Sequence, residues 1–129
     1  KALKPGLDFF RRMQEEGRIP LDEQTYNIAI ELCKECGDTS KALGILRSMS
    51  VAGFPPSVVS FNTALGACET SGNYRLSLEL LGEMRRLSRT PGGAIAPDVL
   101  SYNAALGTCA RAGQWDEVTA LLREMDETL

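Results

Sequence analysis

One sequence pattern occurs three times in this chain of 129 residues. Each copy joins an aromatic residue to an asparagine, places a cysteine six residues after that asparagine, and places a glycine four residues further on. The asparagines are Asn27, Asn62 and Asn103, spaced by 35 and 41 residues. A fixed period in this range is typical of stacked supersecondary units that bury their apolar faces against one another. The chain is therefore expected to form an array of repeats.

Within each copy the apolar residues follow a helical period. The first stripe of the third copy has spacings i, i+4, i+7 and i+8, and it consists of Tyr102, Leu106, Cys109 and Ala110. A glycine follows at Gly37, Gly72 and Gly113, where a left-handed C-cap would end the helix. Asp38 and Asp116 stand where they would favour the start of the next helix. The second stripe of the third copy is Trp115, Val118, Leu121, Leu122 and Met125.

These patterns predict an all-α fold, an α-solenoid of antiparallel helix-turn-helix repeats with about three and a half units and seven helices. Residues 1–22 are expected to be the second half of a truncated unit. Residues 23–57 form a unit, 58–98 a unit with a six-residue insertion, and 99–129 a unit lacking its end. The insertion lies between Met84 and Pro97, where three arginines precede a Pro-Gly-Gly turn. Those arginines either contact an anionic partner or complete a solvated helix C-terminus.

Composition excludes several classes of site. The chain has no histidine, which removes Ser-His-Asp, Cys-His and His-ligated metal sites. The net charge of −3 and the pI near 5.0 argue against a generally basic surface but leave room for a locally basic groove. No apolar run is long enough to span a bilayer. We therefore expect no enzyme activity, no cofactor, no small-molecule substrate and no membrane partner.

Four cysteines raise the question of metal or redox chemistry. Cys33 and Cys36 form a CxxC motif, but the second half of a zinc site is missing. Cys33, Cys68 and Cys109 occupy the same place in each copy. They are expected to be small buried residues in reduced form, and no metal site is predicted.

The chain closely resembles the pentatricopeptide repeat family. The matching segments are VVSFNTAL from Val58, VLSYNAAL from Val99, Lys41-Ala42-Leu43, Glu83-Met84, Glu124-Met125 and Ala96-Pro97-Asp98. Tetratricopeptide repeats run 34 residues and carry a Trp-Leu-Gly-Tyr pattern that this chain does not have.

The resemblance implies binding of single-stranded RNA along the concave face, one nucleotide per repeat, in a mitochondrion or chloroplast. In the family, the residue after the aromatic and the last residue of the repeat read the base. Here these are Asn27 with Ser57, Asn62 with Asp98, Asn103 with a partner beyond Leu129, and Asp22 closing the truncated unit. Asn with Asp is associated with uracil, and Asn with Ser more loosely with cytosine, so the resemblance implies a pyrimidine preference.

The resemblance also assigns the other contacts. An apolar wall against the base comes from the residue three before the asparagine, which is Gln24, Val59 or Leu100, and Gln24 departs from the pattern. A phosphate-contacting lysine is common two residues before the closing glycine, where this chain has Glu35, Thr70 and Arg111. Only Arg111 is basic, which weakens the electrostatic argument for RNA.

Two alternatives stay open. The asparagines are also of a type that bonds to backbone near a helix start. The protein can equally serve as a protein–protein scaffold in a larger organellar assembly, such as a mitochondrial ribosome.

Overall fold

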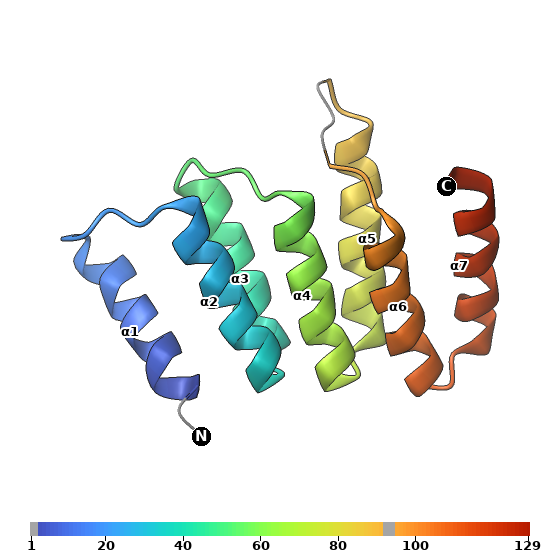
Figure 1. Cartoon of the computed structure of the whole chain (residues 1–129), viewed down its shortest axis with the longest axis horizontal. Helices are drawn as coiled ribbons and strands as arrows, with labels where there is room; N and C mark the ends of the chain where they lie inside the picture. The colour runs from blue at the N-terminus through green and yellow to red at the C-terminus, as the bar shows by residue number, and fades with distance from the viewer. Residues whose placement is uncertain (1–2, 92–94) are drawn as a thin grey trace.

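The computed structural model describes residues 3–91 and 95–129, which form seven α-helices and no strand (Figure 1). The helices are α1 (Leu3–Glu16), α2 (Glu23–Cys36), α3 (Thr39–Val51), α4 (Val58–Ser71), α5 (Tyr74–Ser88), α6 (Val99–Arg111) and α7 (Trp115–Thr128). The predicted all-α solenoid is confirmed. Residues 1–2, and residues 92–94 of the predicted insertion, lie outside the described part of the chain.

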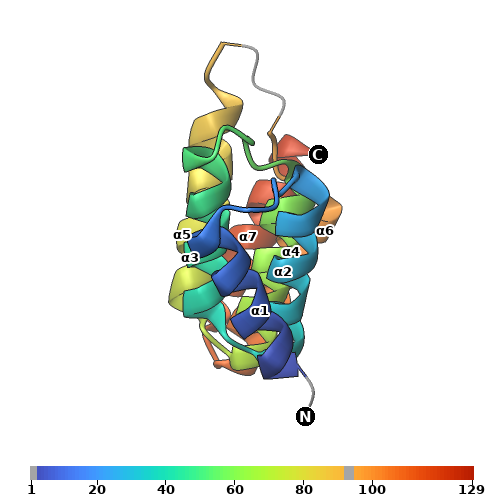
Figure 2. The same ribbon diagram turned by 90° about the vertical axis from the view of Figure 1, so that its left-hand side faces the viewer.

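The helices form two layers. Helices α2, α4 and α6 form the first layer and pack on one another in chain order, while α3 and α5 lie on one side of this layer, on the left in Figure 2. Helices α1 and α7 lie at the two ends of the stack, against α2 and α6 respectively (Figure 1). Among the described residues, no Cα atom of α3 comes within 8 Å of one in α5. The first layer is therefore the continuous part of the stack.

Short polar side chains fix the start of most helices. Asp22, Ser57 and Asp98 cap α2, α4 and α6, and each accepts a bond from the backbone N–H three residues on, at 2.9, 3.3 and 3.0 Å. Asp38 caps α3 as predicted, and Asn73 caps α5. Caps of this kind stabilise a helix by about 1 kcal/mol each. Asp116 instead lies in the first turn of α7, which has no side-chain cap.

The recurring residues of each copy lie in the core. Cys33, Cys68 and Cys109 are fully buried and unpaired, as predicted. Tyr26, Phe61 and Tyr102 are buried one residue before each asparagine. Met49 and Met84 are also fully buried. The recurring residues of the sequence pattern are thus the side chains through which neighbouring helices pack.

One local expectation needs correction. Trp115 and Leu122 are 63% and 52% exposed, because α7 packs closely only on α6 and only one of its faces is covered. Gly113 closes α6 in the left-handed conformation as predicted, at a φ of 73°, directly after the C-cap residue Ala112. Cys36, the second cysteine of the CxxC motif, is exposed while the first is buried.

Two arginines of the predicted cluster have acidic partners. Arg85 bonds to Glu124 of α7, and Arg86 lies 3.9 Å from Glu83 one turn earlier. The Tyr102 hydroxyl donates to the same Glu124 carboxylate at 2.6 Å. Burial and this acidic partner raise the pKa of Tyr102 above its ordinary value. Arg85 therefore ties α5 to α7 at the end of the stack.

Candidate nucleic-acid interface

The face of the first layer carries a groove between α4 and α6. The groove has a volume of about 420 Å³, and its lining includes Val59 and Asn62 of α4 with Leu100 and Asn103 of α6. Val59 and Leu100 are 63% and 66% exposed, which leaves two apolar side chains beside two amides. Four residues that the resemblance assigns to base contact thus border one hollow.

Asn62 is held by the start of the next first-layer helix. Its Nδ2 donates to Asp98 Oδ1 at 3.1 Å, and its Oδ1 accepts from Ser101 Oγ at 2.5 Å. Because an amide has two hydrogens and two carbonyl lone pairs, each end keeps one bonding capacity for a ligand. The sequence-assigned pair Asn62 and Asp98 is therefore in direct contact.

The Asp98 carboxylate is the centre of this network. Its Oδ1 also lies 3.0 Å from the backbone N and 3.0 Å from the hydroxyl of Ser101. Partial burial raises the pKa of Asp98, but the bonds from Ser101 and Asn62 outweigh it and hold the pKa below its ordinary value. Asp98 is therefore ionised at neutral pH and can only accept hydrogen bonds, which fixes Nδ2 as the end of Asn62 that faces it.

Asn27 has a simpler environment. Its Oδ1 accepts from Ser60 Oγ at 2.7 Å, and no bond joins it to Ser57, its assigned partner. Ser57 instead caps α4 and lies 3.3 Å from the Ser60 hydroxyl. The bonds of Asn27 and Asn62 run to side chains of the next first-layer helix and its cap, and not to local backbone, which was the open alternative.

The remaining assigned residues stand apart from this network. Asn103 is exposed and borders the groove from α6. Gln24 is exposed on α2. Asp22 caps α2 through Thr25, and these bonds hold the pKa of Asp22 below its ordinary value. The structure brings together the residues of the second and third copies and leaves Asp22 and Gln24 outside the groove.

Lys34 is a groove residue that the sequence analysis did not identify. It lies seven residues after Asn27, one place before the position where a basic residue was sought. Its side chain crosses α4 at Gly66, where an added Cβ would lie 3.0 Å from Lys34 Cε. Glycine thus permits the close approach, and the ammonium-bearing chain lines the groove with Asn62.

Glu69 holds the corresponding place in the next copy, and it points over Gly107. A Cβ on Gly107 would overlap the Glu69 carboxylate. Arg111, the residue assigned to phosphate contact, lies 3.9 Å from that carboxylate and donates to the Glu69 carbonyl oxygen at 3.2 Å. The one basic residue expected at a phosphate position therefore has an acidic neighbour.

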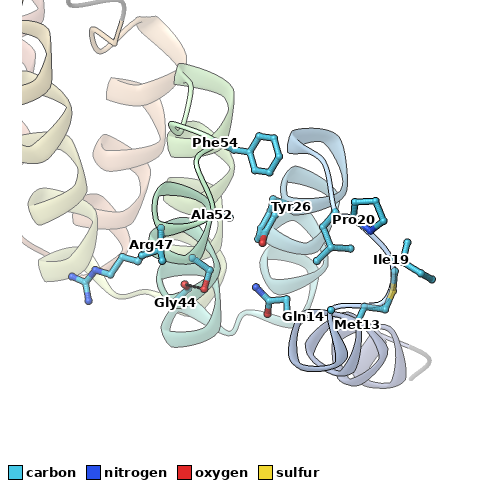
Figure 3. A pocket seen from close by; sticks show the side chains of 13 residues that line it. Met13, Gln14, Ile19, Pro20, Tyr26, Gly44, Arg47, Ala52 and Phe54 are labelled. Carbon is cyan, nitrogen blue, oxygen red and sulfur yellow. Dashed lines mark hydrogen bonds between the residues drawn. The ribbon is translucent and has the colours of Figure 1, made fainter.

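A second hollow of about 590 Å³ opens between α1, α2 and α3 (Figure 3). Tyr26 lies in its wall, with its ring centroid 6.0 Å from that of Phe54. Arg47 is its one charged lining residue, so it offers no acid–base pair. Among the described residues, no cluster of three His, Cys, Asp or Glu is positioned to hold a metal, and no helix is long and apolar enough to cross a membrane.

Comparison with known proteins decides the family. A family model described as "Pentatricopeptide repeat domain" matches residues 8–71 and 45–112, and a "PPR repeat" model matches residues 100–127. The chain belongs to the pentatricopeptide repeat family. Together these matches cover helices α2 to α6, all but the last residue of α7, and most of α1.

Individual relatives agree with this placement. A chloroplastic pentatricopeptide repeat-containing protein of Arabidopsis thaliana is 32% identical over 89 residues, which are 69% of this chain and 11% of that protein. The crystal structure of nuclear proteinaceous RNase P 2 from A. thaliana superposes on 97% of this chain with a TM-score of 0.79, at 16% identity. This chain covers 27% of that structure, so the likeness concerns the repeat fold alone.

Proposed function

We propose that this pentatricopeptide repeat chain binds single-stranded RNA along the face of its first layer, without chemistry of its own. Asn27, Asn62 and Asn103 each contact one base, with Ser57 and Asp98 as second readers for the first two. Val59 and Leu100 pack against base faces, and Arg111 with Lys34 contacts phosphate. The expected preference is for pyrimidines, with cytosine or uracil at Asn27 and uracil at Asn62.

One observation supports the proposal. In the groove between α4 and α6, the Asn62 amide has a defined orientation and lies beside two exposed aliphatic side chains, Val59 and Leu100. Sequence-specific RNA recognition uses unstacked bases, whose edges are hydrogen-bonded and whose faces are packed. The amide of Asn62 supplies a donor and an acceptor for the edge, and Val59 and Leu100 supply the packing.

The biological setting follows from the family and from the chloroplastic relative. We propose that the protein acts in a mitochondrion or chloroplast, in RNA processing, stability or translation. Three readable bases are too few to select one transcript, so the selectivity of the whole protein requires further repeats or a partner.

Short homopolymeric RNAs test the proposal at moderate salt. We expect pyrimidine oligonucleotides to bind more tightly than purine ones, and Asn62→Ala to weaken binding by about 1–3 kcal/mol, the usual worth of a good base-specific contact. Asn73→Ser is the matched control, because it changes an asparagine outside the groove and keeps a capping side chain on α5. Equal binding of all four RNAs, unaffected by Asn62→Ala, would contradict the proposal.

A protein–protein scaffold is the second candidate. The net charge of −3, with Glu35 and Thr70 at two of the three expected phosphate positions, favours it. In that case, crosslinking of the folded protein would capture protein neighbours through the arginines of α5. No RNA crosslink would then form at Asn62 or Asn103.

A further inference from the structure

Two buried serines bridge neighbouring first-layer helices in the same way. Ser60 of α4 and Ser101 of α6 are 0% exposed. The Ser60 hydroxyl donates to Asn27 Oδ1 at 2.7 Å, and the Ser101 hydroxyl donates to Asn62 Oδ1 at 2.5 Å. Each serine belongs to the copy that follows its asparagine. The contact therefore occurs twice, at two separate helix junctions.

Helix capping determines what each hydroxyl can do. The backbone N–H of Ser57 donates to Ser60 Oγ at 3.2 Å, and that of Asp98 donates to Ser101 Oγ at 3.1 Å. A hydroxyl has one hydrogen, and the N–H occupies an acceptor site on the oxygen. Each serine hydroxyl oxygen lies closer to the asparagine Oδ1, at 2.7 and 2.5 Å, than to the cap side chain of Ser57 or Asp98, at 3.3 and 3.0 Å, so the carbonyl end of the amide is the nearest acceptor for that hydrogen. The cap of one helix thus sets which end of the preceding asparagine faces the groove.

From this geometry we infer that Ser60 and Ser101 are positioning residues, each setting the base preference of the asparagine in the preceding copy. The inference rests on the proposed function. Turning an amide over exchanges its donor and its acceptor, and cytosine and uracil differ by the same exchange on their pairing edges. A fixed amide discriminates between these bases, whereas an amide free to turn accepts either.

The two junctions depend on serine to different degrees. Among the described residues, Asn27 has the Ser60 hydroxyl as its one hydrogen-bond partner, while Asn62 is also held by Asp98. Turning the Asn62 amide over would oppose two oxygens at Asp98. Loss of the hydroxyl is therefore more serious at Ser60 than at Ser101.

Thr25 provides the matched control. It occupies the same capping place in α2, and its hydroxyl bonds to Asp22 at 2.8 Å without contacting an asparagine. Thr25→Ala therefore removes a cap hydroxyl and leaves all three asparagines unchanged. The presence of threonine at this place also makes Ser60→Thr a conservative variant that keeps the hydroxyl.

The first measurement needs no RNA. In the free 129-residue chain, the side-chain amide of Asn27 gives its own ¹⁵N–¹H signals. We expect Ser60→Ala to shift these signals and to increase the mobility of the Nδ2 group in ¹⁵N relaxation. Ser60→Thr and Thr25→Ala should leave them close to wild type. Unchanged signals in Ser60→Ala would overturn the inference, whether or not RNA binds.

The second measurement compares oligonucleotides that differ by one cytidine-to-uridine change at each position. We expect Ser60→Ala to reduce the discrimination ratio at one position about fivefold, the fold-change of one ordinary hydrogen bond. Ser101→Ala should give a smaller loss at the neighbouring position, and Ser60→Thr should restore the wild-type ratio. Should Ser60→Ala not fold, Ser101→Ala and the amide signals of Asn62 give the same test.

The outcomes separate this inference from the proposed function. If Asn27→Ala and Asn62→Ala abolish discrimination while the serine variants keep it, RNA reading stands and the positioning role is overturned. If the asparagine variants themselves have no effect on RNA, the proposed function fails and the inference fails with it. A mobile amide with an unchanged ratio also overturns the selectivity role.

Discussion

The α2–α4 junction and the α4–α6 junction place corresponding residues at corresponding points, but with different chemistry. At the first, Lys34 crosses Gly66 and Asn27 has one hydrogen-bond partner. At the second, Glu69 crosses Gly107 and pairs with Arg111, and Asn62 is held by a serine and a carboxylate. The backbone scaffold repeats, while the charge and the number of bonds do not.

This difference separates the part of the repeat that builds the stack from the part that varies. Buried cysteines, aromatics and cap hydroxyls recur at both junctions, where they lie in the packed core of the stack. The side chains that line the groove change sign and partner between junctions. The two junctions therefore present different charges and different hydrogen bonds on the same frame.

The largest expected difference between the junctions concerns stability. Asp98→Ala should lower the free energy of unfolding by about 2 kcal/mol, because it removes a cap and leaves Asn62 and the Ser101 N–H without their charged acceptor. Ser57→Ala should cost about 1 kcal/mol, the value of a cap alone. Urea denaturation measures the free energy of unfolding of both variants. Asp98→Ser is the control, because serine should restore the helix cap. Equal losses at the two sites would show that the extra bonds of Asp98 contribute nothing.

The next expected difference concerns charge in the groove. Lys34→Gln should weaken RNA binding and make the slope of log K against log salt shallower by about 0.7, the contribution of one phosphate contact on a single strand. Glu69→Gln should strengthen binding and steepen the slope by about 0.7, because it leaves Arg111 without its acidic neighbour.

Lys41→Gln is the control for this charge test. Lys41 is an exposed lysine of α3, away from the groove lining. Lys41→Gln changes the net charge by the same amount as Lys34→Gln. The same slope change in Lys41→Gln and Lys34→Gln would mean that net charge, and not a groove contact, governs binding.

The smallest difference is expected at the buried cysteines, where the junctions should behave alike. Burial raises the pKa of Cys33 and of Cys68 to about 12, so neither forms a reactive thiolate at pH 8. Iodoacetamide should label Cys36 alone in the folded chain and all four cysteines after unfolding. Because the raised pKa values belong to the folded state, stability should fall as the pH rises above about 9, where unfolded thiols ionise. Labelling of Cys68 at the rate of Cys36 would contradict the burial of this position.

The fold could be predicted from the sequence because the repeat period determines the order and the packing of the helices. The recurring cysteine, glycine and cap positions predict where helices end and which faces are buried, and the structure agrees. The exposure of Trp115 and Leu122 was not predicted, since a stripe says which face is apolar and not whether another helix covers it.

The site was less accessible to sequence reasoning. The sequence analysis did not identify Ser60 and Ser101, because a local pattern does not show that their hydroxyls reach an asparagine 33 or 39 residues earlier. The sequence analysis missed Lys34 because this residue lies one place before the expected phosphate-contacting position, which is Glu35 in the first copy. The glycine at 66, one helix away, was the available signal that a long side chain crosses there.

The two layers of the stack differ in continuity, and this has a mechanical consequence. The first-layer helices are joined in an unbroken series, whereas the backbones of α3 and α5 are not closely packed. Neighbouring helix pairs can rotate about the first layer without separating closely packed second-layer backbones. We therefore expect changes in the curvature and pitch of the solenoid to alter the spacing between successive asparagines while each capped junction stays intact.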